Sequence, residues 1–189
     1  MKKLSSLTLA ALLLGGLAVP PSRAAIEALD LQTMMTRVDQ AVRGKVVDRT
    51  VFRVNHPVEG RMFFTTITIE GTSLIDGKDV TVPVTYLGGF LSPEEGTRIS
   101  EMPQNHVTQV GKEIVAFYRW SDDMGYGVSA NALYAAHGGV YTVVGKGSKE
   151  IVLGRGDGYA IEANTAITEL RPRVQKIASA LVQEGKQYK

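Results

Sequence analysis

Ser129 has surroundings that suggest chemistry, because it lies in the segment Gly127-Val128-Ser129-Ala130-Asn131. This segment resembles the G-x-S-x-G turn in which α/β-hydrolases expose a nucleophilic serine, although its last position is Asn. A hydrolase would pair Ser129 with a general base, for which His106 or His137 is available. The nucleophile turn needs a strand, a sharp turn and a long helix in a parallel sheet, whereas the flanking sequence predicts antiparallel hairpins. A secreted hydrolase is therefore kept as the alternative function.

The three histidines are the next candidates, because three neutral imidazoles can hold a zinc ion. His56, His106 and His137 are far apart in the sequence and form no local H-x-x-x-H pair. Two loop histidines and one turn histidine beside Gly138 and Gly139 are the simpler explanation. The sequence also has no phosphate-binding loop and no dinucleotide fingerprint. We therefore expect no metal and no other cofactor, and keep a His-based metal site as part of the hydrolase alternative.

Acidic residues occur as the adjacent pairs Glu94-Glu95 and Asp122-Asp123. Adjacent side chains of a polar turn diverge into water, whereas a glycosidase needs two carboxyl groups that face each other across a cleft. The spacing also differs from that of a calcium loop. The tripeptide Arg155-Gly156-Asp157 matches the integrin-binding sequence, but between Gly154 and Gly158 it first predicts a hairpin turn. An adhesive or structural surface protein is the third interpretation.

Aromatic residues near the second acidic pair suggest a binding surface. Tyr118, Trp120 and Tyr126 could form a platform of rings, which offer a large contact area at a modest entropic cost. The alternative is that these rings fill the interior of the fold. The polar loop at residues 91–111 is long for a compact domain and is a second candidate surface. The predicted binding residues are Tyr118, Trp120, Asp122, Asp123, Tyr126 and His106.

Composition limits the class of protein that must position these residues. The chain has 189 residues, of which 44% are hydrophobic and 21% are charged, so disorder is excluded and a folded domain is expected. It has no Cys, which excludes disulfide frameworks, thiolate metal sites and cysteine nucleophiles. The length suits one domain.

The first 24 residues match a secretory signal peptide. Lys2 and Lys3 precede an uncharged apolar segment at residues 7–19, and Ser22-Arg23-Ala24 has small residues where signal peptidase recognises them. The apolar run is short for a membrane span of about 20 residues. We expect cleavage after Ala24, a single domain at residues 25–189 and a periplasmic or secreted location.

Removal of the signal peptide changes the charge of the chain. It leaves 18 basic and 19 acidic residues, a net charge of −1. A chain with this balance has no basic field to attract nucleic acid. No second apolar run approaches the length of a membrane span. We therefore expect neither nucleic acid among the partners nor a membrane span after cleavage.

The remaining sequence predicts a helix, a series of strands and a second helix. Asp30 is a suitable cap for a first helix whose apolar residues keep helical spacing through Ala41. Residues 61–70 are the clearest strand, dense in β-branched and aromatic residues. Pro83 indicates an edge or a bulge in the strand that follows. Strands are predicted at residues 45–54, 61–70, 79–87, 113–120, 140–145 and 150–161. Residues 127–137 fit either a strand, which we favour, or a short helix that Ser129 caps and Gly138 ends.

After Asn164 the helical period returns. An apolar stripe from Ala166 to Leu181 predicts a helix that docks on the sheet, with a partner-binding helix as the alternative. Pro172 should kink this helix or begin a second one. Gly185 should end it, and residues 186–189 are expected to fray.

Short motifs follow one another in a characteristic order between residues 45 and 144. They are Lys45-Val46-Val47, Thr65 to Ile69 with Ser73-Leu74, Val82-Pro83-Val84 through Gly88-Gly89, Met102-Pro103, Gly111 to Phe117 and Gly138 to Val143. This order is similar to that of a group of uncharacterised exported bacterial proteins. That group in turn resembles the netrin-like domain, the oligonucleotide/oligosaccharide-binding (OB)-type barrel of the tissue inhibitors of metalloproteinases.

The resemblance implies a small barrel, and its departures limit what it implies about function. Ile75-Asp76-Gly77 stands where the pattern usually has Leu-Lys-Gly. The inhibitors chelate the protease metal through an N-terminal Cys, and this chain has no Cys. Fold resemblance by itself says little about function.

These observations predict a mainly β fold, a small antiparallel OB/netrin-like β-barrel with flanking N-terminal and C-terminal helices. The barrel core is expected at about residues 45–161. The predicted function is that of an exported, non-enzymatic binding or accessory module for a protein or carbohydrate partner, with an inhibitor-like role as one form of it.

Overall fold

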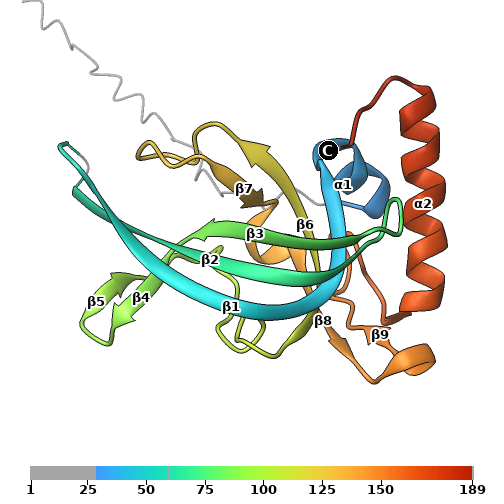
Figure 1. The fold of residues 1–189 in the computed structure, drawn as a ribbon, viewed down its shortest axis with the longest axis horizontal. Coiled ribbons are helices and arrows are strands. Elements are labelled where there is room, and N and C mark those ends of the chain that lie inside the picture. The colour runs from blue at the N-terminus through green and yellow to red at the C-terminus, as the bar shows by residue number, and fades with distance from the viewer. Residues whose placement is uncertain (1–28, 59, 189) are drawn as a thin grey trace, which may run out of the picture.

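The computed structural model describes residues 29–58 and 60–188, so the predicted signal peptide lies outside the described residues. Within these residues, two α-helices and ten strands follow one another (Figure 1). The elements are α1 (Leu31–Arg37), β1 (Gln40–His56), β2 (Gly60–Ser73), β3 (Asp79–Leu87), β4 (Gly89–Ser92), β5 (Glu95–Thr97), β6 (Glu113–Ser121), β7 (Ala130–Leu133), β8 (Val140–Val144), β9 (Ile151–Val152), β10 (Thr165–Ala166) and α2 (Ile167–Gln183). Neither helix has both the length and the apolar character needed to cross a membrane.

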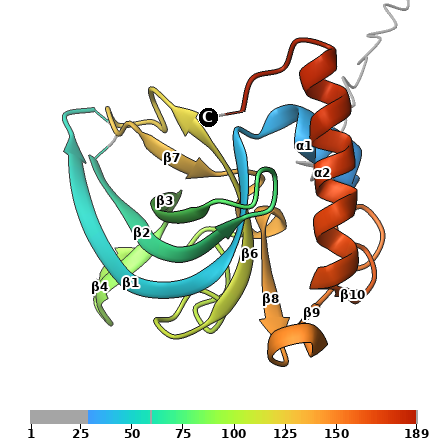
Figure 2. The ribbon, with the colours of Figure 1, turned by 45° about the vertical axis from the view of Figure 1, so that its right-hand side comes forward.

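Five strands close into a barrel in the order β1-β2-β3-β7-β6, and β6 returns to β1. All junctions are antiparallel except β3–β7, which is parallel and consists of the single pair Thr85 and Ala132. Strands β8, β9 and β10 extend the sheet from β6 toward α2 (Figure 2). The predicted class, a small antiparallel barrel with a helix on each side in sequence, is confirmed.

β1 belongs to two parts of the molecule. Its first residues, Gln40–Lys45, pair with β6, and from Val42 onward they also pair with β2, which closes the barrel. A bulge between Val46 and Asp48 bends the strand, and beyond it β1 pairs with β2 alone. Gly44 and Gly71 face each other just before the bend, where a Cβ on Gly71 would collide with the backbone of β1. The pair of glycines lets the two backbones come close at the bend.

The barrel is filled from the inward faces of its strands, and a second core lies between the barrel and the helices. β6 contributes to both, because Ile114, Ala116 and Tyr118 point into the barrel while Val115 and Phe117 point toward the helices. A strand buried on both faces appears in the sequence as a continuous apolar run, which explains residues 113–120. Ile67 and Ile69 of β2 fill the barrel as the alternating pattern predicts.

α1 is capped as predicted, but it is shorter than the sequence suggests. The Asp30 carboxylate accepts a hydrogen bond from the Thr33 N–H at 2.6 Å, and this lowers the pKa of Asp30. The helix ends at Arg37, and Ala41 lies in β1. Ala41 keeps an apolar neighbourhood because it faces the helix-side core from the strand. Its apolar character therefore fits either element, and helical spacing alone extended the predicted helix too far.

α2 runs through Pro172 as one helix, with Gly185 in the left-handed region (φ +98°) just after it. Pro172 lacks only the hydrogen bond to the exposed residue Thr168, four positions earlier. The predicted second helix is therefore absent. The stripe docks on the second core as expected, since Leu170 and Val174 are fully buried.

The expectation of a frayed C-terminus is wrong for the described residues up to 188. The Tyr188 hydroxyl donates to the Met35 carbonyl at 3.0 Å, and the Lys186 ammonium donates to the Thr36 carbonyl at 3.0 Å. These carbonyls belong to the last turn of α1, which has no further helical N–H groups to bind them. The tail therefore ties the two helices together over 153 positions of sequence.

The region predicted as one polar loop, residues 91–111, is partly ordered into β4 and β5 and partly used as a plug. Met102 and Val107 lie in the barrel core. Thr108 is fully buried, and its hydroxyl is 2.9 Å from that of Tyr86 inside the barrel. This segment closes one opening of the barrel, which is a structural role that its mostly polar sequence does not reveal.

Candidate functional site

The predicted platform of three rings does not form a single surface. Tyr118 is 7% exposed and lies in the barrel core, where burial, together with the Asp39 charge, raises its pKa to about 12. Trp120 remains on the surface with 46% of its area exposed, and its indole N–H donates to the Asp122 carboxylate at 2.7 Å. Of the two, only Trp120 can contact a partner. The alternative interpretation, that rings fill the barrel, is confirmed for Tyr118.

The turn between β6 and β7 is held in a defined shape by its own hydrogen bonds. Asp123 accepts from the Gly125 N–H at 2.7 Å, and the Met124 N–H donates to the Val128 carbonyl at 2.7 Å. Tyr126, between two glycines with positive φ, itself has φ +59°. A bulky residue in the left-handed region is uncommon and needs support from its surroundings.

That support comes from the hairpin formed by β1 and β2. The Tyr126 ring packs edge-on against Phe64, with ring centroids 6.2 Å apart, and against His56, with centroids 5.8 Å apart. Phe64 stacks on Phe52, which is its direct partner across the two strands, at 5.6 Å. The β6–β7 turn is thus fastened to the outer part of the hairpin by a cluster of four rings.

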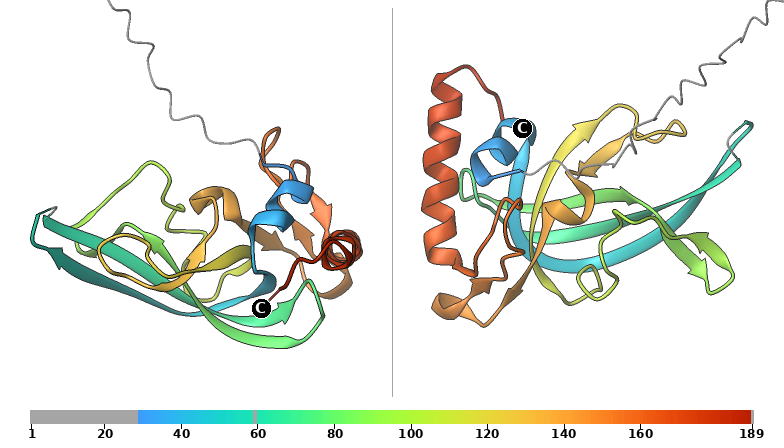
Figure 3. Two further views of the ribbon diagram at one scale, coloured as in Figure 1. Left: turned by 90° about the horizontal axis from the view of Figure 1, so that it is seen from above. Right: turned by 180° about the vertical axis from the view of Figure 1, so that it is seen from behind.

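We call residues 50–56 and 60–66 the arm, because this part of the β1–β2 hairpin projects from the barrel (Figures 1 and 3). The β4–β5 hairpin covers its other face. The Thr65 hydroxyl donates to the Gly88 carbonyl at 2.7 Å, and Arg53 forms an ion pair with Glu95 at 2.6 Å. Glu94, which precedes Glu95 in the sequence, accepts a hydrogen bond from the Ser92 hydroxyl.

Apolar side chains remain uncovered at this end of the molecule. Val58 at the tip of the arm is 87% exposed, and Leu91 and Phe90 of β4 are 49% and 37% exposed. We use the name arm end for three segments taken together: the arm, the β4–β5 hairpin and the β6–β7 turn. Within the described residues, no strand pairs with the outer edge of β1 beyond its bulge. The arm end therefore combines exposed apolar groups with an open strand edge.

The residues of the hydrolase alternative lie in different environments. The Ser129 hydroxyl donates to the Asp122 carbonyl within its own turn. His137 has one ring nitrogen 3.2 Å from the Glu101 carbonyl and the other 3.2 Å from the Tyr159 hydroxyl. His106 lines an open pocket on the opposite side of Tyr159 from α2. Over residues 29–58 and 60–188, no three His, Asp or Glu side chains are grouped so that they could hold a metal ion.

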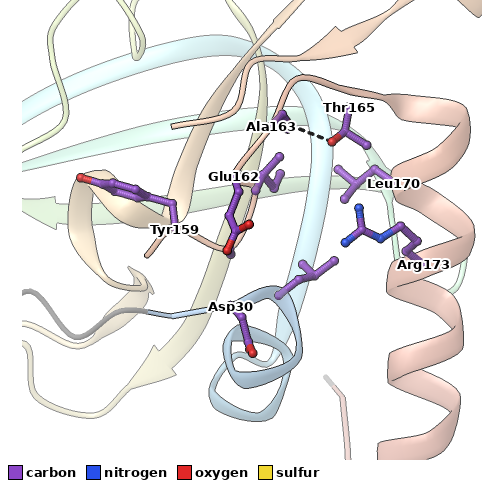
Figure 4. A pocket seen from close by; sticks show the side chains of 10 residues that line it. Asp30, Tyr159, Glu162, Ala163, Thr165, Leu170 and Arg173 are labelled. Atoms are coloured by element: carbon purple, nitrogen blue, oxygen red, sulfur yellow. Dashed lines mark hydrogen bonds between the residues drawn. The ribbon is translucent and has the colours of Figure 1, made fainter. Parts of the chain in front are cut away.

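A smaller pocket lies between α1, α2 and the segment before β10 (Figure 4). It has a volume of about 220 Å³, and Arg173 of α2 and Glu162 point into it. The Thr165 hydroxyl at its rim donates to the Ala163 carbonyl at 2.8 Å. Asp30 also lines it, but its carboxylate is engaged in capping α1. The remaining charged groups are exposed, so this pocket supplies less binding chemistry than the arm end.

The sequence singles out Tyr126 and the acidic turn, but not the cluster of rings on the arm that Tyr126 joins, Phe52, His56 and Phe64. The information was present in the spacing of the hairpin. Phe52 and Phe64 lie at equal distances from Val58, so a hairpin centred on Val58 must pair them. The packing of Tyr126 on this pair joins segments more than 60 positions apart and has no comparable pattern.

In comparisons with known protein families, curated proteins and solved structures, nothing matches this chain. The netrin-like resemblance therefore stays a prediction from sequence motifs. The fold class is carried by the barrel topology itself.

Proposed function

We propose that the chain is an exported, non-enzymatic binding module that recognises a protein partner through the arm end. The observation that carries this proposal is the exposure of Val58 and Leu91 on two hairpins at the same end of the molecule. Exposed apolar side chains that are gathered at one end of a molecule can mark a site that another molecule covers. The ordered cluster of rings beneath them reduces the entropy lost on binding.

The open edge of β1 favours a protein over a carbohydrate as the partner. Unpaired N–H and C=O groups on a strand edge can bind the backbone of an extended segment, and side chains beside the edge then select its sequence. Aliphatic groups such as Val58 and Leu91 bind apolar side chains well and offer nothing to sugar hydroxyl groups. Arg53 and Glu95 supply a charged rim around them.

The barrel class is consistent with this location. OB-type barrels bind ligands with the connections between their first two and their last two strands. In this five-stranded barrel these connections are the tip of the arm and the β6–β7 turn. The two contact each other through His56 and Tyr126.

The test is capture of a partner from envelope extract with the purified mature chain. The variant V58D/L91D places two charges in the arm end, and V182D is the matched control, since Val182 is 53% exposed on α2. We expect the wild type and V182D to capture the same protein and V58D/L91D to lose at least about 90% of it. Protease treatment of the extract should abolish capture. Equal capture by V58D/L91D, or capture that survives protease treatment, would contradict the proposal.

A further inference from the structure

Arg155, the first residue of the Arg155-Gly156-Asp157 motif, is turned inward. The backbone N–H of Arg155 donates to the Ile161 carbonyl at 3.0 Å, and the backbone N–H of Gly156 donates to the Glu162 carbonyl at 2.8 Å. The turn relies on the positive φ of Gly156 (+88°). The Arg155 guanidinium carbon consequently lies 5.5 Å from the ring centroid of Tyr141. This is a half-buried position and not the exposed tip of a loop.

The guanidinium group of Arg155 is held by aromatic rings and not by acids. Besides Tyr141, the ring of Tyr159 lies beneath it, with 5.9 Å between the guanidinium carbon and the ring centroid. Contacts with ring faces fix the position of a guanidinium but leave the N–H groups at its edge available. In the part of the chain that the structure describes, no carboxylate lies within 4.0 Å of it and no side-chain N–H of Arg155 has a protein acceptor. Arg43 and Arg53, by contrast, each have a glutamate partner.

Arg155 opens onto a pocket of about 310 Å³, and none of the residues that line this pocket is acidic. The volume is near the lower end for sites that hold small ligands. The segment before β6 contributes Gln104 and His106, and β8 contributes Thr142. Val107 and the Tyr159 ring give apolar walls. The lining thus combines one fixed cation with an amide, an imidazole, a hydroxyl and an aromatic ring.

The Tyr159 wall is itself held in place. His137 stands between the Tyr159 hydroxyl and the Glu101 carbonyl, 3.2 Å from each. A neutral imidazole protonated on Nδ1 donates to the carbonyl and accepts from the hydroxyl, which satisfies all three groups. Figure 4 shows the Tyr159 hydroxyl directed away from Arg173 and the smaller pocket. The ring therefore separates the two pockets and is not free to swing.

We propose that this pocket binds a small anionic ligand, in which a carboxylate or phosphate group on a polar body such as a sugar ring pairs with Arg155. A guanidinium can donate two parallel hydrogen bonds to either anion. Gln104 and Thr142 then bind hydroxyl groups of the ligand. The site shares no residue with the arm end, so it does not depend on the function proposed above.

The test is calorimetric titration of the mature chain with glucuronate, glucose 6-phosphate and neutral glucose. At least one of the two anions should bind about tenfold or more tightly than glucose, and the tighter one identifies the anionic group. R155M should lower the affinity for that anion by about tenfold or more, and Q104A by a few-fold. R173M is the control, because it removes the same charge from the neighbouring pocket, and it should leave the affinity unchanged.

The proposal is overturned if neither anion binds more tightly than glucose, or if R173M weakens binding as much as R155M does. Should R155M fail to fold, R155K and Q104A carry the test. Lys keeps the charge but cannot form the two parallel bonds. Unchanged anion affinity in both variants would then contradict the proposal.

Discussion

The helix side and the arm end of this molecule differ in how completely their apolar side chains are buried. On the helix side, α1, α2 and the C-terminal tail cover one face of β6, so that Phe117 of β6 and Leu170 of α2 both have zero exposure. At the arm end, two hairpins and a turn are ordered by ring contacts and an ion pair, yet Val58 and Leu91 stay uncovered. Both regions grow from the same strand, β1 (Figure 3). The difference indicates that apolar burial is concentrated on one side, whereas the other side is the one that we propose to contact a partner.

Removal of α2 should have the largest effect, because it should destabilise the helix side. A chain that ends at Asn164 exposes the apolar faces of Phe117 and Tyr141, which α2 and the segments beside it cover. We expect this truncated chain to lose cooperative unfolding, measured by circular dichroism during heating. A fully folded truncated chain would show that α2 is a partner-binding helix and not a part of the core.

A matched pair of phenylalanines measures the same difference within the intact chain. Phe117→Ala removes a fully buried ring that packs edge-on against Tyr141 at 6.1 Å, and should cost about 3–5 kcal/mol of unfolding free energy. Phe90→Ala, at a ring 37% exposed, should cost less than about 1 kcal/mol. Urea denaturation of both variants gives the two values. Similar losses would mean that the arm end is as important to stability as the helix side.

Two arginines of β1 allow the ion pairs of the two regions to be compared by their contribution to stability. Arg43 binds Glu150 with two hydrogen bonds, at 3.0 and 2.6 Å, and Glu113 at 3.1 Å. The Glu150 side chain is only 14% exposed, so Arg43→Met leaves a poorly solvated carboxylate and should cost about 2 kcal/mol. Arg53→Met breaks an ion pair whose side chains are both more than a third exposed, and should cost less than about 1 kcal/mol. Equal costs in urea denaturation would contradict this assignment.

Alkaline pH should affect the folded core through two tyrosines. Burial raises the pKa of Tyr118 in the barrel and of Tyr188 in the tail from 10 to about 12. A pKa raised in the folded state gives stability that is fully present below pH 10 and is lost as pH rises toward 12. The loss should not exceed about 1.4 kcal/mol per pH unit for Tyr118, and it should be smaller for the half-buried Tyr188, because solvent screens that hydroxyl group. Tyr118→Phe and Tyr188→Phe should each make the unfolding free energy less dependent on pH in this window, and an unchanged dependence in both would contradict the burial of their hydroxyl groups.

Those parts of the fold that depend on local periodicity could be predicted from the sequence. The apolar run of β6, the alternation in β2, the Asp30 cap and the stripe of α2 each reflect the neighbours of one element. Contacts between distant segments could not be predicted in this way. The docking of Tyr188 on α1, the burial of Met102 and Val107 in the barrel and the inward turn of Arg155 all depend on residues far away in the chain.

In the candidate site too, local features could be predicted from the sequence and contacts between distant segments could not. The acidic turn and Tyr126 stand out locally, whereas their packing on Phe64 requires the closed barrel. The sequence places Tyr118 and Trp120 on the same side of one strand, because residues two apart along a strand share a face, but whether that face is buried depends on what packs over it. Tyr118 pairs with Gln40 of β1, and Trp120 lies just beyond this last pair of the two strands. The end of that pairing separates a core residue from a surface residue.

The central claim is that partners are met at the arm end and not on the helix side. It is tested most directly by replacing Val58 or Val182, one at a time, with a photo-reactive amino acid and irradiating the mature chain in envelope extract. Both positions are exposed valines, one at the tip of the β1–β2 hairpin and the other in α2, and this hairpin tip and α2 lie at opposite ends of the molecule (Figure 1). The account predicts a discrete cross-linked protein from position 58 and none from position 182. A discrete product from position 182 alone, or none from position 58, would contradict it.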